Sequence, residues 1–174
     1  MTRSDTAVAT IAASGEKTLV LLGEGLAGHV AARMLPRLPE VCFVQADAAG
    51  GVREAALEAA GHALDRLVLL ATVEDLAALD PADGLGGITA DMGGTPALAA
   101  DVAAAGSARR AYELWEGAGL LGQCGRELCR RVADGLELAA AASTGADRSP
   151  IAAQVVLMDP GGERMVGMYG RLGR

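Results

Sequence analysis

Residues 18–47 read TLVLLGEGLAGHVAARMLPRLPEVCFVQAD, and this stretch decides the predicted fold. It opens with a continuous apolar run that stops at Gly23, which is typical of a strand buried on both faces. Apolar side chains then recur every fourth residue over 26–34, which predicts a helix. Residues 41–46 form another apolar run and predict a second strand.

The same alternation continues along the chain. Residues 53–65 predict a helix with one apolar side, and residues 67–73 predict a third buried strand. Strands and helices that alternate over short links indicate parallel βαβ units. Residues 154–158 and 164–169 flank the turn sequence DPGGE and predict a β-hairpin. We therefore expect an α/β fold with three layers: a mostly parallel sheet, helices on both faces, and a C-terminal β-hairpin.

A chain of 174 residues has the usual length of one domain. We expect a flexible N-terminal tail over residues 1–17 and a single α/β domain over residues 18–174. Residues 80–94 contain five Gly and one Pro and predict a long loop. Residues 108–116 and 123–143 predict two further helices from their apolar periodicity.

Composition excludes several classes of partner. The net charge is −7 and only 2% of residues are aromatic, so nucleic acid is an unsuitable partner. No apolar run reaches the ~18 residues of a membrane span, and an acidic surface disfavours anionic membranes. Three cysteines without a paired framework indicate reduced thiols and a cytoplasmic protein, and their spacing predicts no metal site.

The sharpest motif is the glycine series Gly23, Gly25 and Gly28, which matches G-x-G-x-x-G between the first strand and the first helix. In that position the first glycine permits a tight turn, and the second lets a pyrophosphate approach the backbone. The third allows close packing of helix and strand, and free N–H groups at the helix start attract an anion. The motif predicts a nucleotide site, although the same glycines also serve in an ordinary turn.

An acidic residue supports the nucleotide interpretation. Asp47 falls 19 residues after Gly28, at the end of the second predicted strand. A carboxylate in that place accepts hydrogen bonds from a ribose 2′-hydroxyl and disfavours a 2′-phosphate.

Residues 19–79 resemble Rossmann-type dinucleotide-binding domains, most closely the small regulatory kind that gates potassium transport. The resemblance rests on the glycine loop, on VCFVQAD at 41–47 and on ALEAAGHALDRLVLLATVEDLAAL at 56–79. It implies NAD, or another nicotinamide or adenine nucleotide, at the glycines and Asp47, with the backbone near Ala71 and Thr72 facing the ligand.

A second glycine-rich segment, Gly93, Gly94 and Thr95, precedes a predicted helix with Thr95 as N-cap. The sequence ADMGGT at 90–95 resembles a shortened phosphate loop of the tubulin and FtsZ-like fold, which would imply GTP. Free N–H groups at a helix start suit an anion, but a plain capped helix explains the same residues.

The leading hypothesis is therefore a small cytoplasmic nucleotide-binding protein of Rossmann type, either regulatory or related to oxidoreductases. No catalytic constellation is evident, so turnover stays an open question. The alternative is a non-catalytic assembly or scaffold protein, including a degenerate tubulin or FtsZ-like domain. In that case the helix over 123–143 and the hairpin would build a homodimer.

Overall fold

The structure is a computed structural model that describes residues 3–80 and 84–170. The helices of the described residues are α1 (Arg3–Ala13), α2 (Gly28–Met34), η1 (Glu40–Cys42), α3 (Ala48–Gly61), α4 (Val73–Leu79), α5 (Gly84–Asp91), α6 (Pro96–Ala103), α7 (Ala108–Gly117) and α8 (Leu121–Thr144). The strands are β1 (Thr18–Leu22), β2 (Phe43–Gln45), β3 (Arg66–Ala71), β4 (Ala152–Met158) and β5 (Met165–Tyr169).

The five strands form one sheet in the order β2-β1-β3-β4-β5. The first four strands are parallel, and β5 pairs antiparallel with β4 to complete the C-terminal hairpin. Strands β1 and β3 are buried along their whole length except at Arg66, as the continuous apolar runs predict. The predicted α/β class, the parallel sheet and the hairpin are confirmed.

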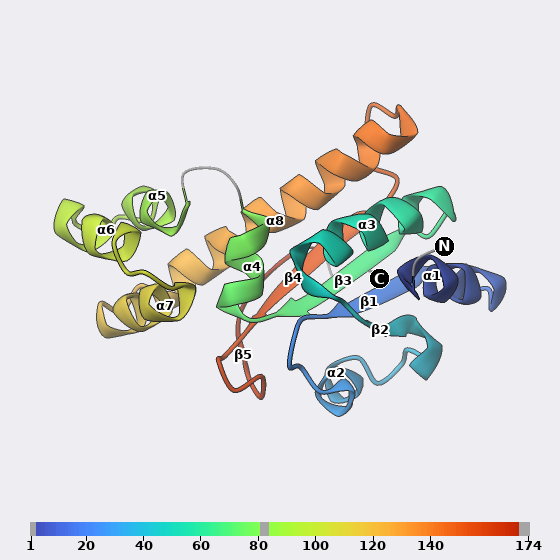
Figure 1. The fold of residues 1–174 in the computed structure, drawn as a ribbon, viewed down its shortest axis with the longest axis horizontal. Coiled ribbons are helices and arrows are strands. Elements are labelled where there is room, and N and C mark those ends of the chain that lie inside the picture. Colours follow the sequence, from blue (N-terminus) through green and yellow to red (C-terminus); the bar gives the residue numbers. More distant parts are fainter. Residues whose placement is uncertain (1–2, 81–83, 171–174) are drawn as a thin grey trace.

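Helices cover both faces of the sheet (Figure 1). The long helix α8 packs along β4 and β5, and it also contacts α3 and α4 on the same face. Helix α2 lies on the opposite face, below the sheet in Figure 1. Helices α5, α6 and α7 pack on one another beyond the end of the sheet.

The N-terminal segment differs from the flexible tail expected for residues 1–17. Residues 3–13 form helix α1, which packs on α3 and η1. Val8 and Ile11 are completely buried there, so the weak apolar patch of this segment joins the core. The extent of a single domain over 18–174 stays a prediction, and residues 171–174 lie outside the described residues.

The glycine-rich segment 80–94 is also different from the predicted loop. Of its described residues, 84–91 form helix α5, while residues 81–83 lie outside the described residues. Gly86 faces α6 so closely that a Cβ there would stand 2.9 Å from Ala103 Cβ and 3.1 Å from Ala99 O. The glycine therefore permits close packing of α5 on α6, which the glycine-rich composition alone does not reveal.

Helix α8 carries the i, i+4 pair Glu127 and Arg131, in which Arg131 Nε lies 3.1 Å from Glu127 Oε1. The pair is largely buried, because the side chains of Glu127 and Arg131 are only 12% and 15% exposed. Arg130 also donates to Glu127, and Arg131 reaches Asp91 at the end of α5. Hydrogen bonds from Arg130 lower the pKa of Glu127 to about 2, so its carboxylate stays charged. The charged network stabilises α8 and the contact between α8 and α5.

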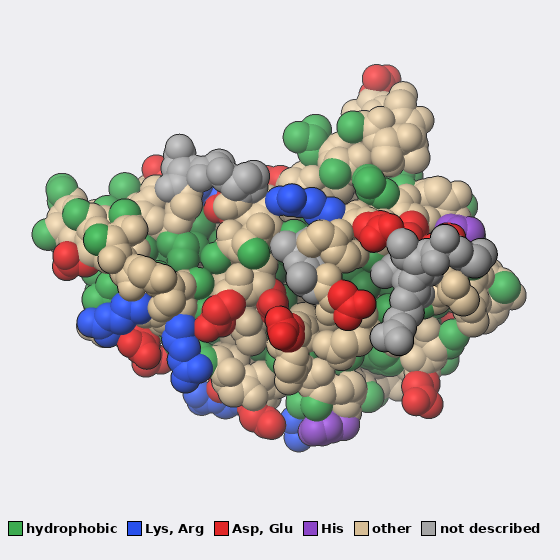
Figure 2. Space-filling view, viewed as in Figure 1, with side chains coloured by type: hydrophobic (Ala, Val, Ile, Leu, Met, Phe, Trp, Pro, Cys, Tyr) green, Lys and Arg blue, Asp and Glu red, His purple; other side chains and the backbone are tan. Residues whose placement is uncertain are grey.

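The described surface is acidic in its central part. Figure 2 shows several acidic side chains gathered near the middle of the face, over the region where α3 and α4 begin. Within the described residues, no helix is long and apolar enough to cross a membrane.

Candidate functional site at the carboxyl ends of the strands

The strand order places a topological switch point at the carboxyl ends of β1 and β3. From β1 the chain moves outward to β2, then returns past β1 to β3, so the direction of winding reverses between β1 and β3. Ligands of open α/β sheets bind at such a switch point. The glycine loop after β1, the start of α3 and the start of α4 all lie at this edge.

Gly23 joins β1 to β3 at this point. Its N–H donates to Leu70 O at 2.8 Å, and its own carbonyl accepts from Gln45 Nε2 at 2.7 Å. A Cβ at position 23 would lie 3.2 Å from Ala71 Cα and would collide with the carboxylate of Asp75. Glycine is required here because β3 and α4 approach the turn closely, which agrees with the tight turn predicted for this position.

The other two glycines of the motif, Gly25 and Gly28, both have open space where a Cβ would stand. Gly25 has a φ of +77°, and no atom lies within 4 Å of where its Cβ would be. A ligand can therefore approach the backbone at Gly25. The space around Gly28 is also open, so this residue does not provide the close helix–strand packing expected of the third glycine.

An open cavity of about 670 Å³ lies over Gly25. Its walls are the turn from Glu24 to Leu26 and the end of β2 from Gln45 to Asp47. Asp47 is exposed at the start of α3 and does not cap the helix with its side chain. Its carboxylate is free to face a ligand in the cavity, as the sequence predicts for a ribose hydroxyl.

Thr72 begins α4 on the other side of the loop. Its hydroxyl donates to Asp75 Oδ2 at 3.3 Å, and Asp75 in turn lies against Gly23. The structure thus brings Thr72, the glycine loop and Asp47 to one edge of the sheet.

Asp75 is the residue of this edge that sequence reasoning missed. Burial raises the pKa of its carboxyl above the ordinary 3.8, the bonds from Thr72 act against this, and the negative charges of Glu24 and Glu74 add to the rise. The only available signal was its place three residues after Thr72 at a helix start, which also fits simple capping.

Asp75 should make stability depend on pH. Its pKa is higher in the folded than in the unfolded chain, so its contribution is full below about pH 3.8 and is lost as pH rises through the raised pKa. We expect Asp75→Asn to flatten the unfolding free energy over this window. Urea denaturation at a series of pH values measures the effect, with the exposed Asp101→Asn as control. Equal pH profiles for wild type and Asp75→Asn would contradict the assignment.

The second glycine segment lies elsewhere. Gly93, Gly94 and Thr95 connect α5 to α6, in the helical group beyond the end of the sheet. The N–H of Gly94 already donates to Thr89 O at 2.8 Å, and Thr95 caps α6 by accepting from Leu98 N. The structure shows a capped helix at these residues and does not bring them to the glycine loop, and a ligand at Gly93, Gly94 and Thr95 stays a prediction.

Charge at the carboxyl edge argues against a phosphate ligand. The charged residues that line the cavity over Gly25 and a small second cavity between Gly23 and Asp75 are Glu24, Asp47 and Asp75, and all are acids. Carboxylates repel a pyrophosphate but attract cationic groups and accept hydrogen bonds from hydroxyls. The edge therefore suits a ligand that carries hydroxyls and positive charge.

Comparison with known proteins gives an independent indication. The chain is 39% identical over 181 residues to a protein of Salinispora tropica named cobalt-precorrin-5B C(1)-methyltransferase, covering 95% of this chain and 44% of that protein. Proteins of the same name match from Salinispora arenicola (39% over 184 residues, 97% of this chain and 45% of that protein) and Rubrobacter xylanophilus (39% over 145 residues, 75% and 36%). The chain spans less than half the length of these curated relatives. No protein-family profile matches the chain, and no solved structure gives a significant match.

These relatives overturn the family inferred from the glycine motif. They are named as methyltransferases, not as Rossmann-type dinucleotide-binding or tubulin and FtsZ-like proteins. The same finding shows that the hypotheses of a nucleotide-binding regulator, an oxidoreductase or an assembly scaffold are wrong. The predicted cofactors NAD and GTP are wrong for the same reason. The physical reason is that the glycine motif reflects the tight turn at Gly23, which packs against β3. The motif does not determine which ligand binds above that turn.

Proposed function

We propose that this chain forms part of a C-methyltransferase that acts on a cobalt-bearing tetrapyrrole precursor of the cobalt-precorrin-5B type. The observation that carries the proposal is the 39% identity over 95% of the chain to proteins of that printed activity. The match covers 95% of this chain, so nearly all of the α/β unit belongs to what is shared.

The methyl donor that we propose is S-adenosylmethionine, whose sulfonium group supplies an electrophilic methyl. The carboxyl edge fits such a molecule because its cavity is of the usual size for small-molecule sites and its charged walls are acidic. Asp47 would accept hydrogen bonds from the ribose hydroxyls. Glu24 would favour the cationic part of the donor over a phosphate.

The glycine loop would hold the donor through its backbone. At Gly25 no side chain stands between the main chain and the cavity, so a ligand can contact the loop directly. Gly28 lies at the start of α2, and Thr72 fixes Asp75 beneath the loop. Gly23, Gly25, Gly28, Asp47 and Thr72 thus remain proposed ligand-site residues.

Isothermal titration of the chain with S-adenosylmethionine tests this proposal. We expect binding that Asp47→Asn weakens by about tenfold or more, because a charged hydrogen-bond acceptor to the ribose is lost. Asp101→Asn, an exposed acid on α6, serves as the matched control and should leave binding unchanged. Binding of NADH or GTP in place of S-adenosylmethionine, or equal affinity in both variants, would contradict it.

Two features of the cellular context follow from the same proposal. We place the chain in the cytoplasm, where a small-molecule biosynthetic enzyme meets its substrate. Self-association of the chain remains a prediction, which sedimentation analysis would test.

A further inference from the structure

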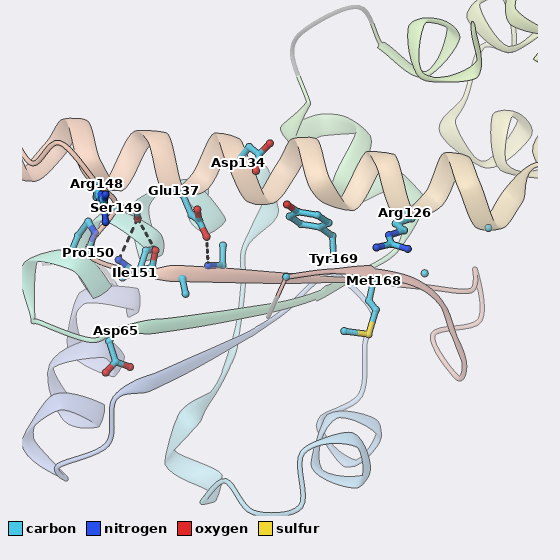
Figure 3. A pocket seen from close by; sticks show the side chains of 15 residues that line it. Asp65, Arg126, Asp134, Glu137, Arg148, Ser149, Pro150, Ile151, Met168 and Tyr169 are labelled. Atoms are coloured by element: carbon cyan, nitrogen blue, oxygen red, sulfur yellow. Dashed lines mark hydrogen bonds between the residues drawn. The ribbon is translucent and has the colours of Figure 1, made fainter. Parts of the chain in front are cut away.

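A second concave surface lies far along the sheet from the glycine loop. It is a groove of about 1000 Å³ between α8 and the β4–β5 hairpin. Figure 3 shows Arg126 and Tyr169 between the helix and the strand, with Arg148 and Ser149 at the other end. The groove follows β5, which is an edge strand of the sheet among the described residues.

The edge strand gives the groove an unused hydrogen-bonding side. A strand at the edge of a sheet leaves a row of backbone N–H and C=O groups without a ladder partner. The side chains of β5 from Val166 to Tyr169 are half-buried, so an added strand would cover apolar surface as well. A further extended segment fits this geometry by pairing with β5.

Two arginines of the groove are left without a carboxylate partner. Arg130 and Arg131 on α8 are both paired with carboxylates, whereas Arg126 and Arg148 pair with no carboxylate in the part of the chain that is described. Three acids, Asp65, Asp134 and Glu137, also line the groove, and two of them are engaged. Glu137 accepts from Ala153 N at 2.8 Å, and Asp134 accepts from Arg130. Carboxylates of an added segment can therefore pair at Arg126 and Arg148.

The lengths of the relatives indicate the occupant. Each curated relative carries more than half of its residues outside the part that this chain matches. We infer that the groove is the docking surface for that unmatched part of the methyltransferase, which adds an acidic extended segment to β5, whether or not it lies on the same polypeptide. The inference rests on the proposed function.

Binding to a defined partner tests the inference. The unmatched part of the Salinispora tropica relative would be produced separately and titrated against this chain. We expect binding that the double variant Arg126→Glu/Arg148→Glu weakens by about tenfold or more. Arg109→Glu, an exposed arginine on α7 outside the groove, is the matched control and should bind as wild type does.

Hydrogen exchange provides a second readout that needs no variant. Docking should slow amide exchange in β5 and in the facing side of α8, and it should leave α5 and α6 unchanged. Absence of binding, binding insensitive to the double variant, or protection confined to another surface would each overturn the inference. So would dimerisation of this chain through the groove, seen as a mass that the double variant halves. Binding of S-adenosylmethionine that depends on Asp47 would still stand in those cases, which separates this failure from failure of the proposed function.

Discussion

Trp115→Ala is expected to lower the free energy of unfolding by about 4 kcal/mol. Trp115 on α7 is completely buried, and its indole Nε1 donates to Thr89 Oγ1 at 2.8 Å. Thr89 is itself completely buried on α5 and donates to Leu85 O. The substitution therefore leaves a large cavity and removes the bond that joins α5 to α7.

Urea denaturation followed by far-ultraviolet circular dichroism measures this effect, because Trp115 is the only tryptophan and its fluorescence is lost in the variant. Leu138→Ala serves as the control, since that side chain on α8 is 73% exposed, and it should change stability by less than about 0.5 kcal/mol. A loss below about 1 kcal/mol for Trp115→Ala would show that the α5–α7 group does not depend on this anchor.

Gly23→Ala is expected to destabilise the fold by about 2 kcal/mol, while Gly28→Ala in the same motif should be nearly neutral. The new Cβ at position 23 meets the Ala71 backbone and the Asp75 carboxylate, whereas the space at position 28 is open. Thermal and urea unfolding of the two variants compares them directly. If both substitutions cost the same, then the contact between the glycine loop and β3 is not what requires glycine at position 23.

The buried parallel strands could be predicted because their signal is local. Residues 19–22 are apolar at every position, and such a short run between turn residues is typical of a strand covered on both faces. The N-cap at Thr95 is equally local, since the bond from Leu98 N lies within one turn.

Other elements depend on partners distant in sequence. The glycine-rich composition of helix α5 indicates a loop. The glycine at position 86 is explained only by the close contact of α5 with α6. The N-terminal helix is likewise stabilised by burial of Val8 and Ile11 and not by its polar composition.

The candidate site could be predicted in its position but not in its chemistry. The glycine loop and Asp47 come to one edge, as the spacing indicates, and the two cavities there have no basic residue in their lining. The acids that determine this charge come from three segments of the chain. Asp75 in particular reaches Gly23 only through the fold, so a pattern of spacings does not reveal the contact.

Methyl transfer itself is the most direct test of the proposed methyltransferase activity. This chain would be incubated with the unmatched part of the Salinispora tropica relative, with cobalt-precorrin-5B and with methyl-labelled S-adenosylmethionine, and the tetrapyrrole would be analysed by mass spectrometry. We expect that one labelled methyl group is added, and that Asp47→Asn but not Asp101→Asn reduces the yield. An unchanged tetrapyrrole, in conditions where the intact relative methylates it, would contradict the proposed activity.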